Sequence, residues 1–229
     1  KFMNSSANPM QLNKAKAFFN GQSVEHVVIN EATYINAYAF YKCSSLRSVT
    51  LGDNVTHIDD YAFYNCSSLT SVTIPNSVTT IGSFAFSGCS SLTSITIPEN
   101  VEYIESGAFN NCSSLETVNF NAVNCEFSDL FYACPNLKTV KIGNKVESIP
   151  AYAFRDTENL ERVYIPDIAI YISPYAFDGC ERVAVVCKNG SYAIVNPAFK
   201  VLSFADEAPE GIIPIDGYVP HTANNTLHD

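Results

Sequence analysis

The chain has 229 residues, of which 47% are apolar and 16% charged, so it holds enough apolar material for one continuous core. Thirteen basic residues against 23 acidic ones give a formal net charge of −10, which would repel nucleic acid and anionic lipid headgroups. No run of apolar residues is long enough to span a membrane. We therefore expect neither a nucleic-acid partner nor insertion into a membrane.

Residues 1–23 precede any repeated pattern and are expected to form an N-terminal cap. Within them, Met10 to Asn20 places Leu12, Ala15 and Phe18 on one face at helical spacing, which predicts a short amphipathic helix. The first residue is Lys1 rather than Met, so we expect an upstream region such as a signal peptide to be missing.

Residues 24–186 repeat one motif every 22 or 23 residues. A phenylalanine marks each unit, at Phe40, Phe63, Phe86, Phe109, Phe131, Phe154 and Phe177. Six residues later comes a leucine in all units but the last, and three residues beyond it a valine or isoleucine. A residue type that recurs at one position stacks on its own copies, so the pattern predicts a solenoid of about seven units.

Each unit carries two local signals. Segments such as Val72-Thr73-Ile74 alternate apolar and polar residues and are rich in β-branched side chains, which predicts short strands that pair in parallel between units. The compact segment Tyr38 to Cys43 predicts a single helical or 3₁₀ turn.

The composite unit A-F-x-x-C-S-S-L-x-S-[VI]-T-I-P-x-x-V-x-x-I resembles the BspA-type leucine-rich repeat of bacterial and some protist surface proteins. The resemblance covers residues 24–186, with departures at Asp129, Leu130 and Thr157. It implies a right-handed leucine-rich-repeat solenoid of the α/β type, with a short parallel sheet on its concave face and a cap at each end. It also implies binding to something outside the cell, commonly a host or matrix protein.

After the repeats, residues 187–205 are expected to form a C-terminal cap. Val183 to Cys187 predicts a final strand, Ser191 to Phe199 shows a helical pattern, and Val201 to Phe204 could close the sheet. Residues 206–229 are rich in proline and acidic residues, which indicates a tail or linker.

Six of the eight cysteines hold one repeat position, at Cys43, Cys66, Cys89, Cys112, Cys134 and Cys180. Side chains in such a column point the same way at about 5 Å spacing, which suits buried thiols better than disulfides. Paired C-x-x-C motifs are absent, so we expect no metal and no cofactor. Cys125 and Cys187 lie outside the column, and Cys125 falls where exposed residues are expected, so it is the predicted reactive thiol.

Two outward columns of the predicted strands offer a surface for a ligand. Most members are serine or threonine, which are ordinary solvent-facing strand residues. Toward the C-terminus the columns change character and bring basic, aromatic and amide side chains onto adjacent strands. These residues form the predicted ligand site, although they also suit a plain solvated surface: Asn119, Lys138, Lys141, Arg162 and Tyr164.

The triplets that begin at Asn54, Asn65 and Asn111 match the N-glycosylation pattern, and two of them arise from the repeat itself. No catalytic motif appears among the residues, so we do not expect an enzyme. The sequence favours a non-enzymatic, monomeric, extracellular or cell-surface bacterial module that binds protein or glycan through the concave face. The alternative is a structural spacer or assembly component of a larger surface or phage-like protein, and an enzyme ranks last.

Overall fold

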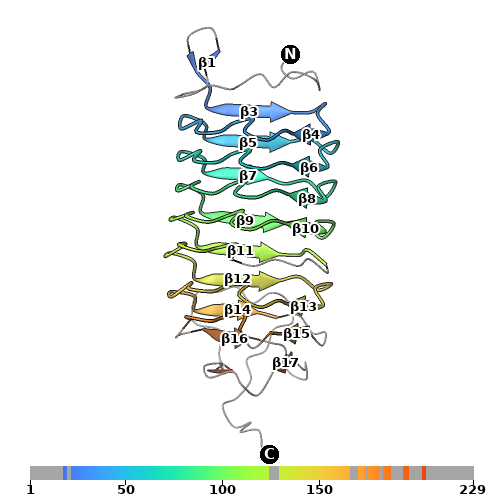
Figure 1. The fold of residues 1–229 in the computed structure, drawn as a ribbon, viewed down its shortest axis with the longest axis vertical. Coiled ribbons are helices and arrows are strands. Elements are labelled where there is room, and N and C mark those ends of the chain that lie inside the picture. Colours follow the sequence, from blue (N-terminus) through green and yellow to red (C-terminus); the bar gives the residue numbers. More distant parts are fainter. Residues whose placement is uncertain are drawn as a thin grey trace, which may run out of the picture.

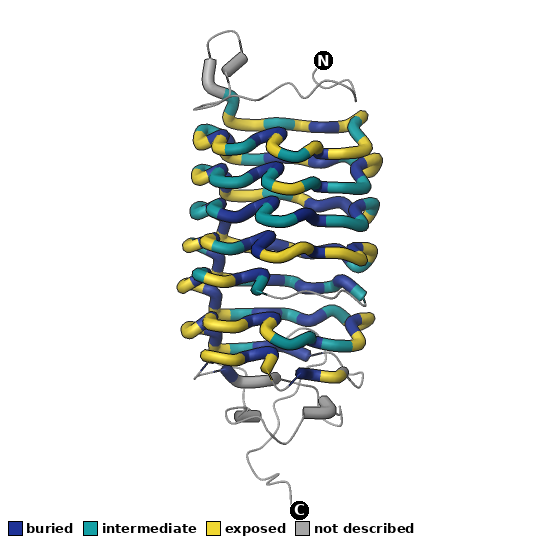
Figure 2. Tube along the Cα trace, in the orientation of Figure 1, coloured by how far each residue is buried: buried dark blue, intermediate teal, exposed yellow. Residues whose placement is uncertain are grey.

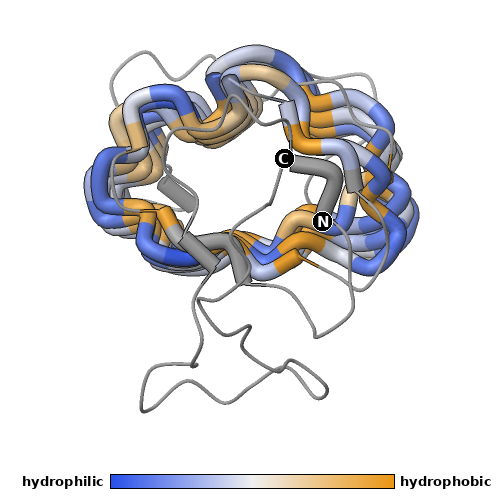
Figure 3. Tube along the Cα trace, turned by 90° about the horizontal axis from the view of Figure 1, so that it is seen from below, coloured by the Kyte–Doolittle hydropathy of each residue, from blue (hydrophilic) through white to orange (hydrophobic). Residues whose placement is uncertain are grey.

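The computed structural model describes residues 18–19, 22–123, 129–165, 170–173, 175–180, 183–186, 193–195 and 203–204. They form an elongated stack in which each turn of the chain lies on the next (Figure 1). Seen along the long axis, successive turns superpose as a ring, and hydrophobic positions recur at the same places around it (Figure 3). The buried residues recur at the same places in each turn (Figure 2).

Two columns of strands line the stack. We call one the long-strand face, and its members are β3 (His26–Ile29), β5 (Ser48–Leu51), β7 (Ser71–Thr73), β9 (Ser94–Ile97), β11 (Thr117–Phe120), β12 (Thr139–Ile142), β14 (Arg162–Tyr164), β16 (Ala184–Val186) and β18 (Ser203–Phe204). The other, the short-strand face, comprises β4 (Tyr34–Ile35), β6 (His57–Ile58), β8 (Thr80–Ile81), β10 (Tyr103–Ile104), β13 (Ser148–Ile149), β15 (Ile170–Ile172) and β17 (Ala193–Val195).

Pairing within both columns is parallel and in register with the repeat. Val118 lies opposite Val140, which lies opposite Val163, so each residue neighbours its own copy in the next turn. Burial alternates along the strands, as in β9, where Ile95 and Ile97 are buried and Ser94 and Thr96 are exposed. The long-strand face divides into two sheets between β7 and β9. The described short strands form two groups, β4 to β10 and β13 to β17, and residues 124–128 between these groups lie outside the described part of the chain.

The phenylalanines of the repeat stack into a continuous spine through the core. Neighbouring ring centroids lie 5.0 to 5.7 Å apart, and the ring planes differ by 1° to 16°. The rings from Phe63 to Phe154 are at most 1% exposed, and the leucine column beside them is fully buried. The predicted stacking of the repeat columns is therefore confirmed.

The corner that carries the spine is not helical. In several units alternate backbone amides donate to the next turn, as when Tyr38, Phe40 and Lys42 donate to the carbonyls of Asp60, Ala62 and Tyr64. An α-helix would direct these donors back along its own axis. The residues that the structure describes contain no helix, so the α/β label is wrong for them, and the corner is a chain of turns.

The terminal segments also differ from expectation where they are described. Phe18–Phe19 (β1) pairs antiparallel with Gln22–Ser23 (β2), so these two residues do not end a helix, and the rest of the predicted Met10 to Asn20 helix lies outside the described residues. Ala193–Val195 pairs with β15 as a strand rather than a helix. Ser203–Phe204 pairs with β16, as predicted for the segment that extends the sheet.

Residues 206–229 lie outside the described part of the chain. Among the residues that are described, no segment forms a helix with the length and apolarity that a membrane crossing needs.

Replacing Phe86 with alanine should lower the free energy of unfolding by about 3 to 5 kcal/mol. Its ring is fully buried between those of Phe63 and Phe109, so truncation leaves a cavity in the centre of the spine. The matched control is Ser71→Ala, at an exposed position of β7, which should change stability by less than about 0.5 kcal/mol. Urea denaturation of both variants tests this, and equal losses would contradict the assignment of inward and outward positions.

Candidate functional site

The two outward columns predicted from the sequence exist on the long-strand face. Thr117 lies opposite Thr139, which lies opposite Arg162. In the neighbouring column, Asn119 lies opposite Lys141, which lies opposite Tyr164. Four of the five predicted site residues are thus on adjacent strands, and Lys138 immediately precedes β12.

The cations of this region are partly offset by carboxylates. The Arg162 Nη1 atom lies 3.5 Å from the Glu161 Oε2 atom. The exposed Lys138 has Glu116 and Glu161 at the same position of the two adjoining turns, and its backbone bonds to both. Asn119 donates a hydrogen bond from its side chain to the Thr96 hydroxyl at 3.0 Å. The positive electrostatic potential at this surface is therefore weaker than the cations alone would produce.

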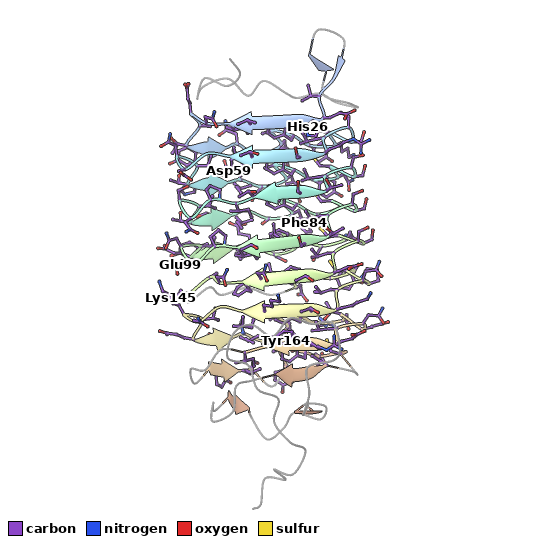
Figure 4. The ribbon with its side chains drawn as sticks, turned by 180° about the vertical axis from the view of Figure 1, so that it is seen from behind. His26, Asp59, Phe84, Glu99, Lys145 and Tyr164 are labelled. Atoms are coloured by element: carbon purple, nitrogen blue, oxygen red, sulfur yellow. The ribbon has the colours of Figure 1, made fainter. Side chains whose placement is uncertain are left out.

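Tyr164 does not stand on the surface with the other predicted residues. Its side chain is 2% exposed, and burial raises the pKa of its hydroxyl while the charge of Arg162 opposes that shift. Figure 4 labels it on β14. A buried ring cannot act as an exposed anchor, so the accessible part of the predicted site consists of Asn119, Lys138, Lys141 and Arg162. Whether these residues bind a ligand stays a prediction.

The six cysteines of the column are buried and form no disulfide, as predicted. Most of these thiols donate to the carbonyl oxygen of the spine phenylalanine in the preceding turn, as Cys89 does to Phe63 at 3.3 Å. Thr157 replaces cysteine in one unit, and its hydroxyl donates to the Phe154 carbonyl at 2.7 Å. Cys125 and Cys187 lie outside the described residues, so the reactivity predicted for Cys125 stays a prediction.

Burial makes the thiols of this column poor nucleophiles. Desolvation raises the pKa of the Cys89 thiol to about 12 and that of Cys66 well above its ordinary value. For Cys112, a hydrogen bond with the Cys134 thiol and burial together raise the pKa. The column therefore acts as small apolar packing with a weak donor.

A second surface was missed in the sequence and lies at the corner outside the phenylalanine spine. We call it the aromatic corner, and its residues are Tyr38, Tyr41, Tyr61, Tyr64 and Phe84. The rings of Tyr38, Tyr61 and Phe84 stack with centroids 5.1 and 5.4 Å apart, and Tyr41 stacks on Tyr64 at 5.2 Å. Edge contacts of 5.4 and 5.5 Å join the two ladders.

The backbone directs the Tyr38, Tyr61 and Phe84 rings outward. Their φ angles are 61°, 55° and 53°, in the left-handed region that bulky residues seldom adopt. The three-ring ladder ends at Gly107, where a β-carbon would lie 2.5 Å from the Phe84 ring. The sequence feature that could have predicted the aromatic corner is the aromatic residue two positions before the spine phenylalanine in three successive units.

The same backbone geometry accounts for two of the glycosylation triplets. Asn65 and Asn111 occupy the repeat position two places after the spine phenylalanine, with φ angles of 55° and 59°. Asparagine tolerates this conformation better than most residues, and Gly88 and Gly179 hold the same position in other turns. Backbone geometry is therefore sufficient reason for asparagine at these places.

No group of three or more potential metal ligands occurs within the part of the chain that the structure describes.

The BspA-type leucine-rich-repeat family, whose model holds six copies of the repeat, matches residues 14–130 and 127–207. The chain belongs to this family. Its resemblance to the family in sequence is thereby confirmed, and the solenoid of stacked parallel strands is the fold of a leucine-rich-repeat protein. Proteins of this kind are general binding scaffolds, typically without catalytic activity.

Solved structures of bacterial leucine-rich-repeat proteins are similar to this one. TpLRR of T. pallidum is 28% identical with a TM-score of 0.53, over 67% of this chain and 69% of that one. A protein of Bacteroides ovatus is 24% identical with a TM-score of 0.44, over 77% of this chain and 60% of that one. One of Eubacterium ventriosum is 22% identical with a TM-score of 0.49, over 86% and 64%. The chain thus spans less than two thirds of the last two proteins.

Among curated protein sequences, none matches this chain.

The protein should lose stability as the pH rises from about 9 to about 12. The Cys89 thiol has an ordinary pKa of 9.0 and a folded value of about 12, so its contribution is complete below pH 9 and disappears as the pH approaches the folded value. Between these limits each such thiol costs about 1.4 kcal/mol per pH unit. Urea unfolding of the wild type and of Cys89→Ser, measured across this range, tests the contribution.

The serine variant cannot ionise at this position, so the stability gap between the two proteins should shrink as the pH rises. Thr157 shows that the column accepts a hydroxyl. A gap that stays constant with pH would mean that the Cys89 thiol does not resist ionisation.

Proposed function

We propose that this chain is a non-enzymatic module that binds a protein partner outside the cell. The observation that carries the proposal is the aromatic corner, where Tyr38 is 46% exposed and the neighbouring rings are held in fixed stacks. Tyrosine is enriched at protein interfaces because a rigid amphipathic ring gives much contact area for little entropy. Stacking already restricts the conformational freedom of these side chains, so less entropy is lost when a partner binds.

A protein fits the aromatic corner better than a glycan does. In the three-ring ladder, both faces of Tyr61 are covered, by Tyr38 and by Phe84. A sugar that stacks on an aromatic side chain needs an open ring face. Among the described rings of this ladder, only Tyr38 has a face that is covered neither by another ring nor by Gly107, and the rest of the ladder presents ring edges. Such a surface suits the mixed polar and apolar contacts of a protein interface.

The accessible residues of the long-strand face remain a second proposed surface. This surface brings three cations together on two adjacent turns: Lys138, Lys141 and Arg162. Asn119, on the turn before them, completes the group. Nearby carboxylates partly offset the positive potential of these cations, so we rank this surface below the aromatic corner.

Extracellular display, by analogy with BspA-type surface proteins, is part of the proposal and rests on that family resemblance. The buried cysteine column is compatible with an oxidising environment, because thiols of raised pKa and low accessibility react slowly.

The alternative function, a structural spacer, is favoured by the way many surface side chains bind the chain itself. Asn100 donates to the carbonyl of Asn76, Asn136 to that of Ser113, and Ser91 to that of Ser67. Side chains satisfied by the neighbouring turn offer less to a ligand and more to the rigidity of the stack.

The test is a binding screen of the purified chain against immobilised extracellular proteins and a glycan array. Two variants accompany the wild type: Tyr38→Asn with Tyr61→Asn, and Lys138→Ala with Lys141→Ala and Arg162→Ala. Both should keep the wild-type melting temperature, since all the changed side chains lie outside the apolar core. We expect the wild type to capture a protein and the tyrosine variant to lose at least tenfold in affinity, as expected from removing two interface tyrosines.

If only the lysine and arginine variant lost binding to the captured protein, the binding site would lie on the long-strand face instead of the aromatic corner. Binding of glycans in place of proteins would overturn the proposed ligand class. If the folded, monodisperse wild type bound neither, the spacer would be the better function.

A further inference from the structure

We propose that the aromatic corner binds a cationic segment, rich in arginine or lysine, of the protein partner. This inference rests on the proposed function and adds the chemistry of the partner. It depends on how the ring ladders end and on the carboxylates beside them.

Two ring ladders of this solenoid have a cation of the chain over their first ring. The Lys42 Nζ atom lies 4.9 Å from the centroid of Tyr41, which begins the Tyr41 and Tyr64 ladder. The Arg155 guanidinium carbon lies 5.5 Å from the centroid of Tyr152, which begins a ladder with Tyr175. A cation over a tyrosine face is attracted by the ring quadrupole, and its aliphatic stem packs on the ring.

The longest ladder lacks such a partner among the described residues. Tyr38 begins it, is 46% exposed, and uses one face to stack on Tyr61. No cation of the described part of the chain lies over it, whereas its neighbour Tyr41 has Lys42. An arginine or lysine of a partner could lie over Tyr38 as Lys42 and Arg155 lie over theirs.

Two carboxylates border the same ladder. Asp60 immediately precedes Tyr61, and its backbone carbonyl accepts the amide of Tyr38. Ser83 immediately precedes Phe84, and it donates from its amide to the Asp60 carboxylate and from its hydroxyl to the Glu105 carboxylate. These bonds hold the two carboxylates beside the rings, in positions to pair with a cation that contacts the ladder.

The charge of the whole chain supports a partner of the opposite sign. With a formal net charge of −10, the protein repels acidic segments and steers basic ones toward its surface. Net charge alone does not say where a cationic segment would bind, whereas the rings and the carboxylates together indicate the aromatic corner.

The experiment measures the binding of a labelled arginine, glycine and serine peptide by fluorescence anisotropy at low and high salt. The comparison peptide has glutamine in place of every arginine. We expect the wild type to bind the arginine peptide and to bind the glutamine peptide at least tenfold more weakly.

The decisive variant is Tyr38→Asn with Tyr61→Asn, which removes two rings without changing the charge. Asparagine accepts the positive φ of these positions, so the backbone is not strained further. Affinity for the arginine peptide should fall about threefold, as expected when the one cation contact that the outer face of Tyr38 offers is lost. Tyr38→Phe with Tyr61→Phe should retain it, because the rings remain.

The matched control is Tyr103→Asn with Tyr171→Asn, which removes two exposed tyrosines of the short-strand face and should leave affinity unchanged. Asp60→Asn keeps an acceptor for Ser83 but removes a charge, and it should weaken binding a few-fold, as expected for an exposed ion pair.

Equal affinity of the wild type and the Tyr38 and Tyr61 asparagine variant would overturn the inference, because only net charge would then explain the binding. Equal binding of the two peptides by the wild type would also overturn it. Either result would leave the proposed function intact if the screen still captured a protein partner, whereas a screen without any partner would count against the function itself.

Discussion

The structure depends on one constraint, that each turn of the chain must have the same height as its neighbours. Only then can each spine phenylalanine stack on the next, with centroids 5.0 to 5.7 Å apart. The alternate amides at the corner enforce this height, because they donate to the adjacent turn rather than within their own. Rings and backbone hydrogen bonds therefore specify the same spacing, and burial of the spine makes any departure costly.

The surface inherits its order from this interior constraint. When inward residues are in register, outward residues are also in register, so chemistry repeated on the outside appears as columns. In the aromatic corner the consequence is an exposed ladder with the spacing of the buried one, 5.1 Å between Tyr38 and Tyr61 against 5.0 Å between Phe40 and Phe63. The fold thus supplies the preorganisation that an isolated surface tyrosine would lack.

Periodicity was enough to predict the solenoid, the parallel strands, the spine and the burial of the cysteine column, because each is a property of residues that recur. Two features escaped it. A six-residue corner such as Tyr38 to Cys43 gives no sign of which amides bond within the corner and which to the next turn. The prediction of a helical or 3₁₀ turn was therefore right only for alternate amides, such as those of Tyr41 and Cys43, which donate to carbonyls three residues earlier, and no helix forms. The burial of Tyr164 could not follow from its column, where Thr50, Thr73 and Thr96 are exposed, because burial depends on packing specific to that part of the stack.

The one shortened unit shows which part of each turn keeps this constraint. Between Phe109 and Phe131 the spacing is 22 residues instead of 23, yet the rings still stack at 5.7 Å. Lys145 reaches Glu99, two units earlier, at 2.8 Å along the same edge of the stack (Figure 4). Both side chains are well exposed, so this ion pair adds little stability. The missing residue therefore leaves the stacking of the spine in place. A binding surface that depends on regular spacing is accordingly well placed at the corner beside the spine, where the backbone follows the spacing of the stacked rings.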